Sequence, residues 1–135
     1  MKGLEITDTT EDNFLSVDLF EILTQIGSLV EESEWYLADL ECFGESAEEM
    51  MDLADNKTHI SGQKMLELSA QLTQIIDGIF TGHQQDREHP WIVIQSIDSS
   101  AYEVFSTDQT TLSNIKQHFK NVREISITEE LQAIA

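Results

Sequence analysis

The fold class of this chain is decided by the stretch Trp91-Ile92-Val93-Ile94-Gln95-Ser96-Ile97-Asp98-Ser99-Ser100-Ala101-Tyr102-Glu103-Val104-Phe105. Two runs rich in β-branched and aromatic residues flank a polar turn, and Pro90 introduces the first run. This pattern is typical of a β-hairpin, because such side chains favour strands and clustered Asp and Ser favour turns. We therefore predict antiparallel strands over residues 91–97 and 101–106.

The residues that follow predict a helix and a returning strand. The helix is expected over 109–120, with Thr107 or Asp108 as its N-cap. Its apolar face is formed by Leu112, Ile115 and Phe119. A strand is predicted over 122–127, after which Thr128 is placed to cap a final turn.

Two long amphipathic helices are predicted upstream, over 14–31 and 61–82. Their apolar residues recur at intervals of three and four: Leu15, Leu19, Ile22, Ile26 and Leu29 in the first, and Met65, Leu68, Leu72, Ile75 and Ile79 in the second. Ser61 is placed to cap the second helix. The dipeptide Asp77-Gly78 is also a typical hairpin turn. Because the helical period continues on both sides of this pair, we favour the helix.

Residues 35–43 are compatible with either a strand or a helix. Aromatic residues favour a strand ending at Gly44, in which Tyr36, Ala38, Leu40 and Cys42 share one face. Glu, Ala and Leu in the same segment favour a helix, and the strand is our preferred interpretation. Ser46 and Glu49 have the spacing of a capping box, which predicts a short helix over 47–54.

These elements predict an α+β fold in a single domain, residues 1–135. We expect a small, mainly antiparallel sheet of about four strands, covered by two long amphipathic helices and a shorter third. The strands are those at 34–43, 91–97, 101–106 and 122–127. Along the chain, a polar lead-in (1–13) precedes a mainly helical acidic part (14–82) and a hairpin-helix-strand part (90–127).

The negative charge is concentrated in one part of the chain. Residues 1–56 contain 16 acidic residues and a single base, Lys2, and so carry 15 of the 19 net negative charges. A surface of this kind attracts cationic partners and repels nucleic acids and anionic membranes. We therefore expect a basic protein partner, with no direct binding to nucleic acid or to a membrane.

The chain shows no signal for secretion or membrane insertion. Cys42 is the only cysteine, so no internal disulfide can form, and the first twenty residues lack an apolar run. Uninterrupted apolar runs elsewhere are far shorter than the ~20 residues of a membrane helix. A cytoplasmic protein is expected.

Motifs for catalysis, nucleotides and metals are weak. The chain contains no glycine-rich phosphate loop and no G-x-S-x-G motif, and acidic neighbours of Cys42 disfavour its thiolate. One group of possible metal ligands occurs in a polar loop: His83, Asp86, Glu88 and His89. Nothing in that loop preorganises these ligands, so we predict neither a metal site nor an enzyme.

Two functions remain from the sequence. The first is a non-enzymatic acidic module, similar in kind to an inhibitor, immunity protein or adaptor, that binds a basic partner. Its candidate contact residues are Trp35, Tyr36, Asp39, Glu41, Phe43, Glu45, Glu48 and Asp52. The alternative is a small-ligand or haem-binding protein that uses His83, His89 and Trp91, since a histidine beside aromatic residues can be an axial ligand in its pocket. Charge runs are most often solvated faces, which is the simplest explanation of the acidity.

Overall fold

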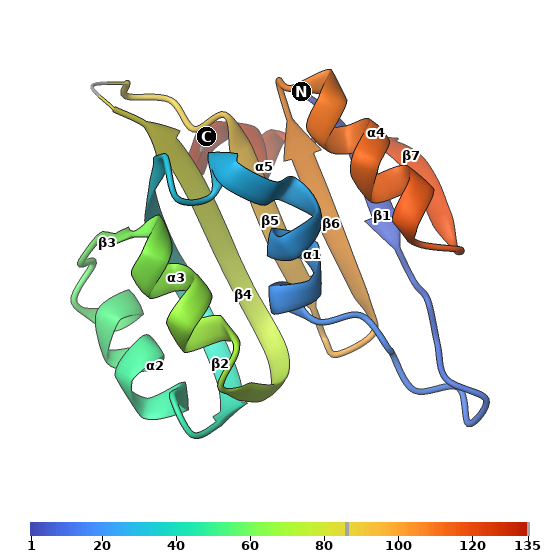
Figure 1. The fold of residues 1–135 in the computed structure, drawn as a ribbon, viewed down its shortest axis with the longest axis horizontal. Coiled ribbons are helices and arrows are strands. Elements are labelled where there is room, and N and C mark those ends of the chain that lie inside the picture. The colour runs from blue at the N-terminus through green and yellow to red at the C-terminus, as the bar shows by residue number, and fades with distance from the viewer. Residues whose placement is uncertain (86, 135) are drawn as a thin grey trace.

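The computed structural model describes residues 1–85 and 87–134, which form one antiparallel sheet with helices on both faces (Figure 1). The strands are β1 (Lys2–Ile6), β2 (Ser33–Gly44), β3 (Ile60–Ser61), β4 (Leu72–Gln84), β5 (Ile92–Ile97), β6 (Ala101–Ser106) and β7 (Val122–Ser126). Their order in the sheet is β3-β2-β4-β5-β6-β1-β7, and every neighbouring pair is antiparallel.

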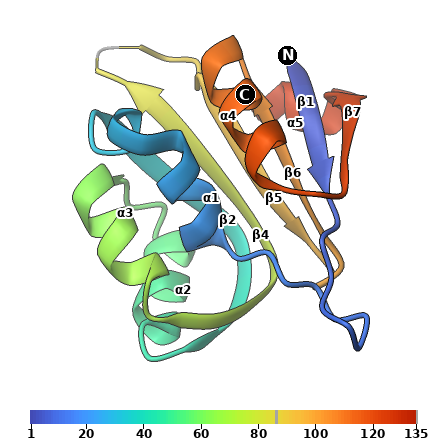
Figure 2. The same ribbon diagram turned by 45° about the vertical axis from the view of Figure 1, so that its right-hand side comes forward.

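The helices lie mainly on one side of this sheet. They are α1 (Leu19–Ile26), a 3-10 turn η1 (Gly27–Leu29), α2 (Ala47–Asp55), α3 (Gly62–Ser69), α4 (Gln109–His118) and α5 (Glu129–Ile134). Figures 1 and 2 show α1, α3 and α4 in front of the sheet and α5 behind it. The main core lies under the frontal helices, and a smaller apolar cluster lies between α5 and the outer face of the sheet.

The α+β class is confirmed, but the predicted sheet of about four strands with three helices is wrong. The described residues contain seven strands and five α-helices. The hairpin of β5 and β6, the helix α4 and the strand β7 lie where the sequence places them. Asp108 caps α4, and the Thr128 hydroxyl accepts a hydrogen bond from the Leu131 amide at the start of α5.

The largest error is the helix predicted over 61–82. Only α3 is helical there, with Ser61 as its N-cap as expected, and β4 occupies the remainder. Ile75, Ile79 and Thr81 are β-branched residues that suit a strand, and β4 pairs with β2 on one side and β5 on the other. Pairing with distant strands therefore outweighs a local helical period, which matched this sequence by coincidence.

The N-terminal predictions also need correction. Residues 1–13 were expected to form an unpacked lead-in, but β1 lies between β6 and β7 with Leu4 and Ile6 buried. The helix expected over 14–31 is shorter: α1 begins after its N-cap Asp18 and ends at Gly27, whose φ of 81° is a left-handed conformation favoured by glycine.

The strand preferred over 35–43 is confirmed as β2, although its faces differ from those predicted. Trp35 and Leu37 lie in the main core, and so does Cys42, whereas Ala38 packs with the outer cluster. Between Ala38 and Glu41 the register with β4 shifts by one residue, a β-bulge that contains Asp39. The additional residue reverses the alternation, so the inward positions change from odd to even along the strand.

The short helix predicted over 47–54 is confirmed as α2, but the capping box is not formed. The Ser46 hydroxyl donates instead to the Leu68 carbonyl oxygen at 2.6 Å, and it makes no bond to the first turn of α2. This buried bond ties the start of α2 to the end of α3. The serine therefore joins two helices rather than completing one.

Gly78→Ala distinguishes a strand from a helix at this position by the sign of its effect. In a helix interior, this change would stabilise the protein by about 1 kcal/mol. In β4, an added Cβ would lie 2.9 Å from the Leu40 side chain and 3.0 Å from the fully buried Phe80 ring. We expect a loss of about 1–3 kcal/mol in the free energy of unfolding, measured by urea denaturation.

Glu103→Gln is expected to stabilise the protein at neutral pH. Glu103 lies opposite Glu5 on the neighbouring strand, and burial, followed by the Glu5 charge, raises the pKa of Glu103. A raised pKa in the fold favours the protonated carboxyl, so stability is lost as the pH rises through that pKa. We expect a gain of roughly 0.2–0.5 kcal/mol at pH 7, limited by solvent screening, that disappears below about pH 4.

Glu124→Gln is the control of opposite sign for this measurement. Its hydrogen bond with Lys116 lowers the pKa of Glu124, so the ionised carboxylate contributes stability above its ordinary pKa. This contribution is lost as the pH falls through the lowered pKa. A stabilisation by Glu124→Gln equal to that of Glu103→Gln would show that general charge reduction, and not the Glu5 and Glu103 pair, causes the effect.

Candidate functional site

An acidic surface is formed by β2, α2 and the turn that precedes β2. Ten of its carboxylate side chains are exposed: Glu31, Glu32, Glu34, Asp39, Glu41, Glu45, Glu48, Glu49, Asp52 and Asp55. The turn from β2 into α2 is short and the two elements are in contact, so these carboxylates lie on neighbouring elements. Glu48 and Glu49 lie in the first turn of α2, where they also stabilise the positive end of the helix dipole.

Few cations neutralise this surface. Lys64 pairs with Glu49 at 2.8 Å, a hydrogen bond that raises the pKa of Lys64, and His59 Nδ1 lies 3.2 Å from Glu34 Oε2. Within residues 1–85 and 87–134, the other eight carboxylates make no ion pair. Most of the negative charge therefore faces solvent and is free to act on an approaching molecule.

The candidate aromatic contacts divide into exposed and buried residues. Tyr36 is 39% exposed and Phe43 is 54% exposed. Trp35 is fully buried, and its Nε1 donates to the Val30 carbonyl oxygen at 3.0 Å. Trp35 is therefore a core residue, and the prediction that it contacts a partner at the surface is wrong. Asp39, Glu41, Glu45, Glu48 and Asp52 are exposed as the sequence-based hypothesis requires.

Tyr36 lies in a cluster that the sequence did not indicate. The His59 ring stacks on it at a centroid distance of 5.3 Å, and the His83 ring meets it edge-on at 4.9 Å. These three residues are distant in the sequence and come together because β2 pairs with β3 on one side and β4 on the other. No local signal connects them, so only the strand order reveals the cluster.

A groove lies beside this cluster, on the outer face of β2 and β4. Its volume is about 1030 Å³, and its floor includes Tyr36, Ala38, Ile79, Thr81 and His83. Charged residues stand around the floor: Glu34, Asp39, Asp55, Lys57, Arg87 and Glu88. The groove thus combines an apolar and aromatic floor with four carboxylates and two cations.

The residues of the haem hypothesis are not brought together into one pocket. His83 lines the groove on the outer face, whereas His89 and Trp91 line a different hollow with Leu29 and Thr107. Trp91 is buried, and its Nε1 donates to the Ser33 hydroxyl at 2.8 Å. The indole therefore has a structural partner, and the two histidines do not face a common space.

The possible metal ligands of the polar loop are only partly described. Asp86 lies outside the described residues. The spacing of the complete group, His83, Asp86, Glu88 and His89, is therefore not described by the structure. Among residues 1–85 and 87–134, no group of three or more His, Cys, Asp or Glu side chains is arranged to hold a metal ion.

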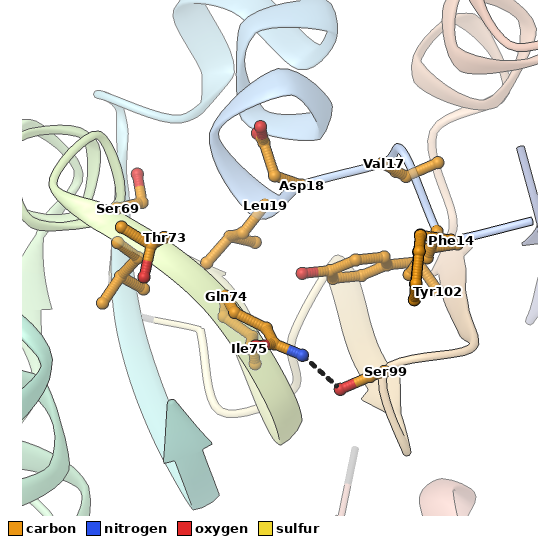
Figure 3. Close-up of a pocket in the computed structure, with 12 residues that line it drawn as sticks. Phe14, Val17, Asp18, Leu19, Ser69, Thr73, Gln74, Ile75, Ser99 and Tyr102 are labelled. Carbon is orange, nitrogen blue, oxygen red and sulfur yellow. Dashed lines mark hydrogen bonds between the residues drawn. The ribbon is translucent and has the colours of Figure 1, made fainter. Parts of the chain in front are cut away.

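A second pocket, of about 340 Å³, lies between the start of α1, the start of β4 and the β5–β6 turn (Figure 3). The Tyr102 ring forms one wall, and burial raises the pKa of its hydroxyl. The Gln74 side chain donates to the Ser99 hydroxyl across the rim at 3.1 Å. Phe14, 71% exposed, stands at the entrance. Gln74 and Ser99 thus satisfy one another, and the Asp18 carboxylate, which also lines the pocket, accepts a hydrogen bond from the Glu21 amide as the N-cap of α1.

The only thiol is also unsuited to catalysis. Cys42 is 3% exposed, and burial raises the pKa of its thiol, so the reactive thiolate is disfavoured. Its sulfur lies 4.0 Å from the Ala47 carbonyl oxygen, inside the contact between β2 and α2. Cys42 therefore contributes to packing.

Comparison of the chain with protein-family models, with curated proteins and with solved structures found no match. Among the described residues, none of the helices combines the length and the hydropathy that a membrane crossing requires.

Haemin is expected to give no histidine-dependent spectrum with this protein. An axial ligand and a porphyrin pocket must share one enclosed space, and His83 and His89 line separate open hollows. A haemin titration followed in the Soret region should be unchanged by His83→Ala or by His89→Ala. A stoichiometric Soret shift that either substitution abolishes would contradict this expectation.

Proposed function

We propose that this protein is a non-enzymatic module that binds a basic protein through the acidic surface of β2 and α2. The observation that carries the proposal is the set of ten exposed carboxylates on adjacent elements, of which two have an ion-pair partner among the described residues. Opposite charges steer diffusional encounter and suppress binding to other acidic molecules. The surface therefore favours partners with a dense positive charge.

Exposed aromatic residues support a binding role over a purely solubilising one. A solvated charged face does not require large apolar side chains, yet Tyr36 and Phe43 are exposed on the strand that carries the acids. Aromatic residues are enriched among the side chains that dominate binding energy, while charges at the rim mainly set the association rate. Carboxylates around exposed rings are thus the composition expected of a docking surface.

The electrostatic part of the proposal is tested by charge reversal. Glu45→Lys, Glu48→Lys and Asp52→Lys together should slow association with a basic protein such as cytochrome c, because they reverse the local field. The control variant carries Glu11→Lys, Glu129→Lys and Glu130→Lys, which change the net charge by the same amount at exposed positions away from the surface. Association rates are measured by stopped-flow fluorescence at low and high salt.

We expect the first variant to associate at least about tenfold more slowly than the control at low salt, and the difference to shrink as the Debye length falls from ~30 Å at 0.01 M to ~8 Å at 0.15 M. Equal rates for the two variants would show that net charge alone controls encounter. The acidic surface would then have no special role.

A further inference from the structure

The outer face of the sheet is covered only in part, which leaves the groove open. Leu131 of α5 packs over Ile79, Val93 and Phe105. The groove lies next to this covered area, over β2 and β4, and Ile79 belongs to both. Figures 1 and 2 show α5 behind the sheet and α1, α3 and α4 in front of it. The groove also reaches Leu37 and Ala54, which belong to the main core.

The aromatic wall of the groove has one side already occupied. His59 stacks nearly parallel to Tyr36, with 15° between the ring planes, but it lines a separate hollow with Glu31 and Glu32. Tyr36 and His83 both line the groove and meet at an interplanar angle of 69°. The stack with His59 holds the tyrosine in place, and Tyr36 remains 39% exposed where it lines the groove.

Carboxylates line the same groove as that aromatic wall. Asp39 occupies the β-bulge with a φ of 50°, a conformation that Asp and Asn tolerate better than other non-glycine residues. The bulge interrupts the alternation of β2 at this point, and Asp39 lines the groove together with Glu34 and Asp55. An aromatic wall beside carboxylates is complementary to a planar cation. Such a cation can stack on an aromatic ring while the N–H groups along its edge donate to the two oxygens of a carboxylate.

We propose that this groove receives an arginine-containing extended segment of the basic partner, an inference that rests on the proposed function and specifies its central contact. Guanidinium is planar, stacks on aromatic faces and binds carboxylates through two parallel hydrogen bonds, whereas the lysine ammonium is a compact and strongly hydrated charge. The four carboxylates against two cations around the floor give the required charge complementarity. The apolar floor accommodates the methylene stem of the arginine.

The test compares two fluorescent peptides of equal length and charge, one with arginine and one with lysine between glycine and serine spacers. Fluorescence anisotropy at low ionic strength measures their affinities for the full chain. We expect the arginine peptide to bind about three- to tenfold more tightly, as a stacked and partly desolvated guanidinium predicts. Equal affinities for the two peptides would overturn the proposal.

Matched variants locate the contact. Tyr36→Leu should remove the arginine preference, while Phe20→Leu, an aromatic residue of α1 that is 40% exposed and does not line the groove, should retain it. Asp39→Asn, which keeps a residue suited to positive φ, should weaken the arginine peptide more than Glu41→Gln does. Circular dichroism melting checks that each variant is folded.

The outcomes separate this inference from the proposed function. If Tyr36→Leu and Phe20→Leu have equal effects, the groove is not the contact, although binding of both peptides to the acidic surface would persist. If both peptides bind the Glu45→Lys, Glu48→Lys, Asp52→Lys variant as tightly as the unmodified protein, the acidic surface itself has no role and both proposals fail. Loss of the arginine preference in Tyr36→Leu alone supports the groove.

Discussion

The pairing of β2 with β4 is the interaction on which the rest of this structure depends. It joins the longest strands of the sheet and continues from Ser33↔Gln84 to Gly44↔Leu72. Gly82 permits this pairing under the core: a Cβ there would lie 2.8 Å from Ile92 and 3.1 Å from Trp35, both fully buried. The indole and the β4 backbone therefore approach as closely as they do because this position has no side chain.

Three register shifts adapt that pairing to both faces of the sheet. β2 gains a residue at Asp39, and β4 gains one at Ile76 immediately afterwards, since Glu41 pairs with Asp77 and Cys42 with Ile75. β4 gains another between the pairs Phe43↔Gln74 and Gly44↔Leu72. The first bulge lets β2 direct Trp35 and Leu37, and then Cys42, into the main core. The second restores the register and places Asp77 so that its carboxylate accepts the Asp98 amide of the β5–β6 turn at 2.9 Å. The bulges thus couple the acidic strand to the central hairpin.

Sequence reasoning succeeded where structure is local and failed where it depends on pairing. The β5–β6 hairpin, α4 and the caps at Ser61 and Asp108 follow from short patterns, and each is present. β4 was missed because its apolar spacing also fits a helix and only its pairing with β2 and β5 decides between them. Likewise Trp35 and Tyr36 are neighbours on one strand and so lie on opposite faces. Only the pairing of that strand in the sheet decides that Trp35 is buried and Tyr36 is exposed. The cluster of Tyr36 with His59 and His83 has no sequence signal at all.

The location of the acidity limits its possible roles. β3 pairs with only Glu34 and Trp35 of β2, so the rest of β2 borders the edge of the sheet. Charges and a β-bulge at such an edge disfavour edge-to-edge association of sheets, which explains part of the acidity. This protection does not require Tyr36 and Phe43 to be exposed on that strand, nor a groove with an aromatic wall beside the bulge. A second acidic copy would be repelled by the same charges, whereas a cationic segment would be attracted by them. The charges that disfavour self-association of β2 are therefore the same charges that the proposed basic partner would contact.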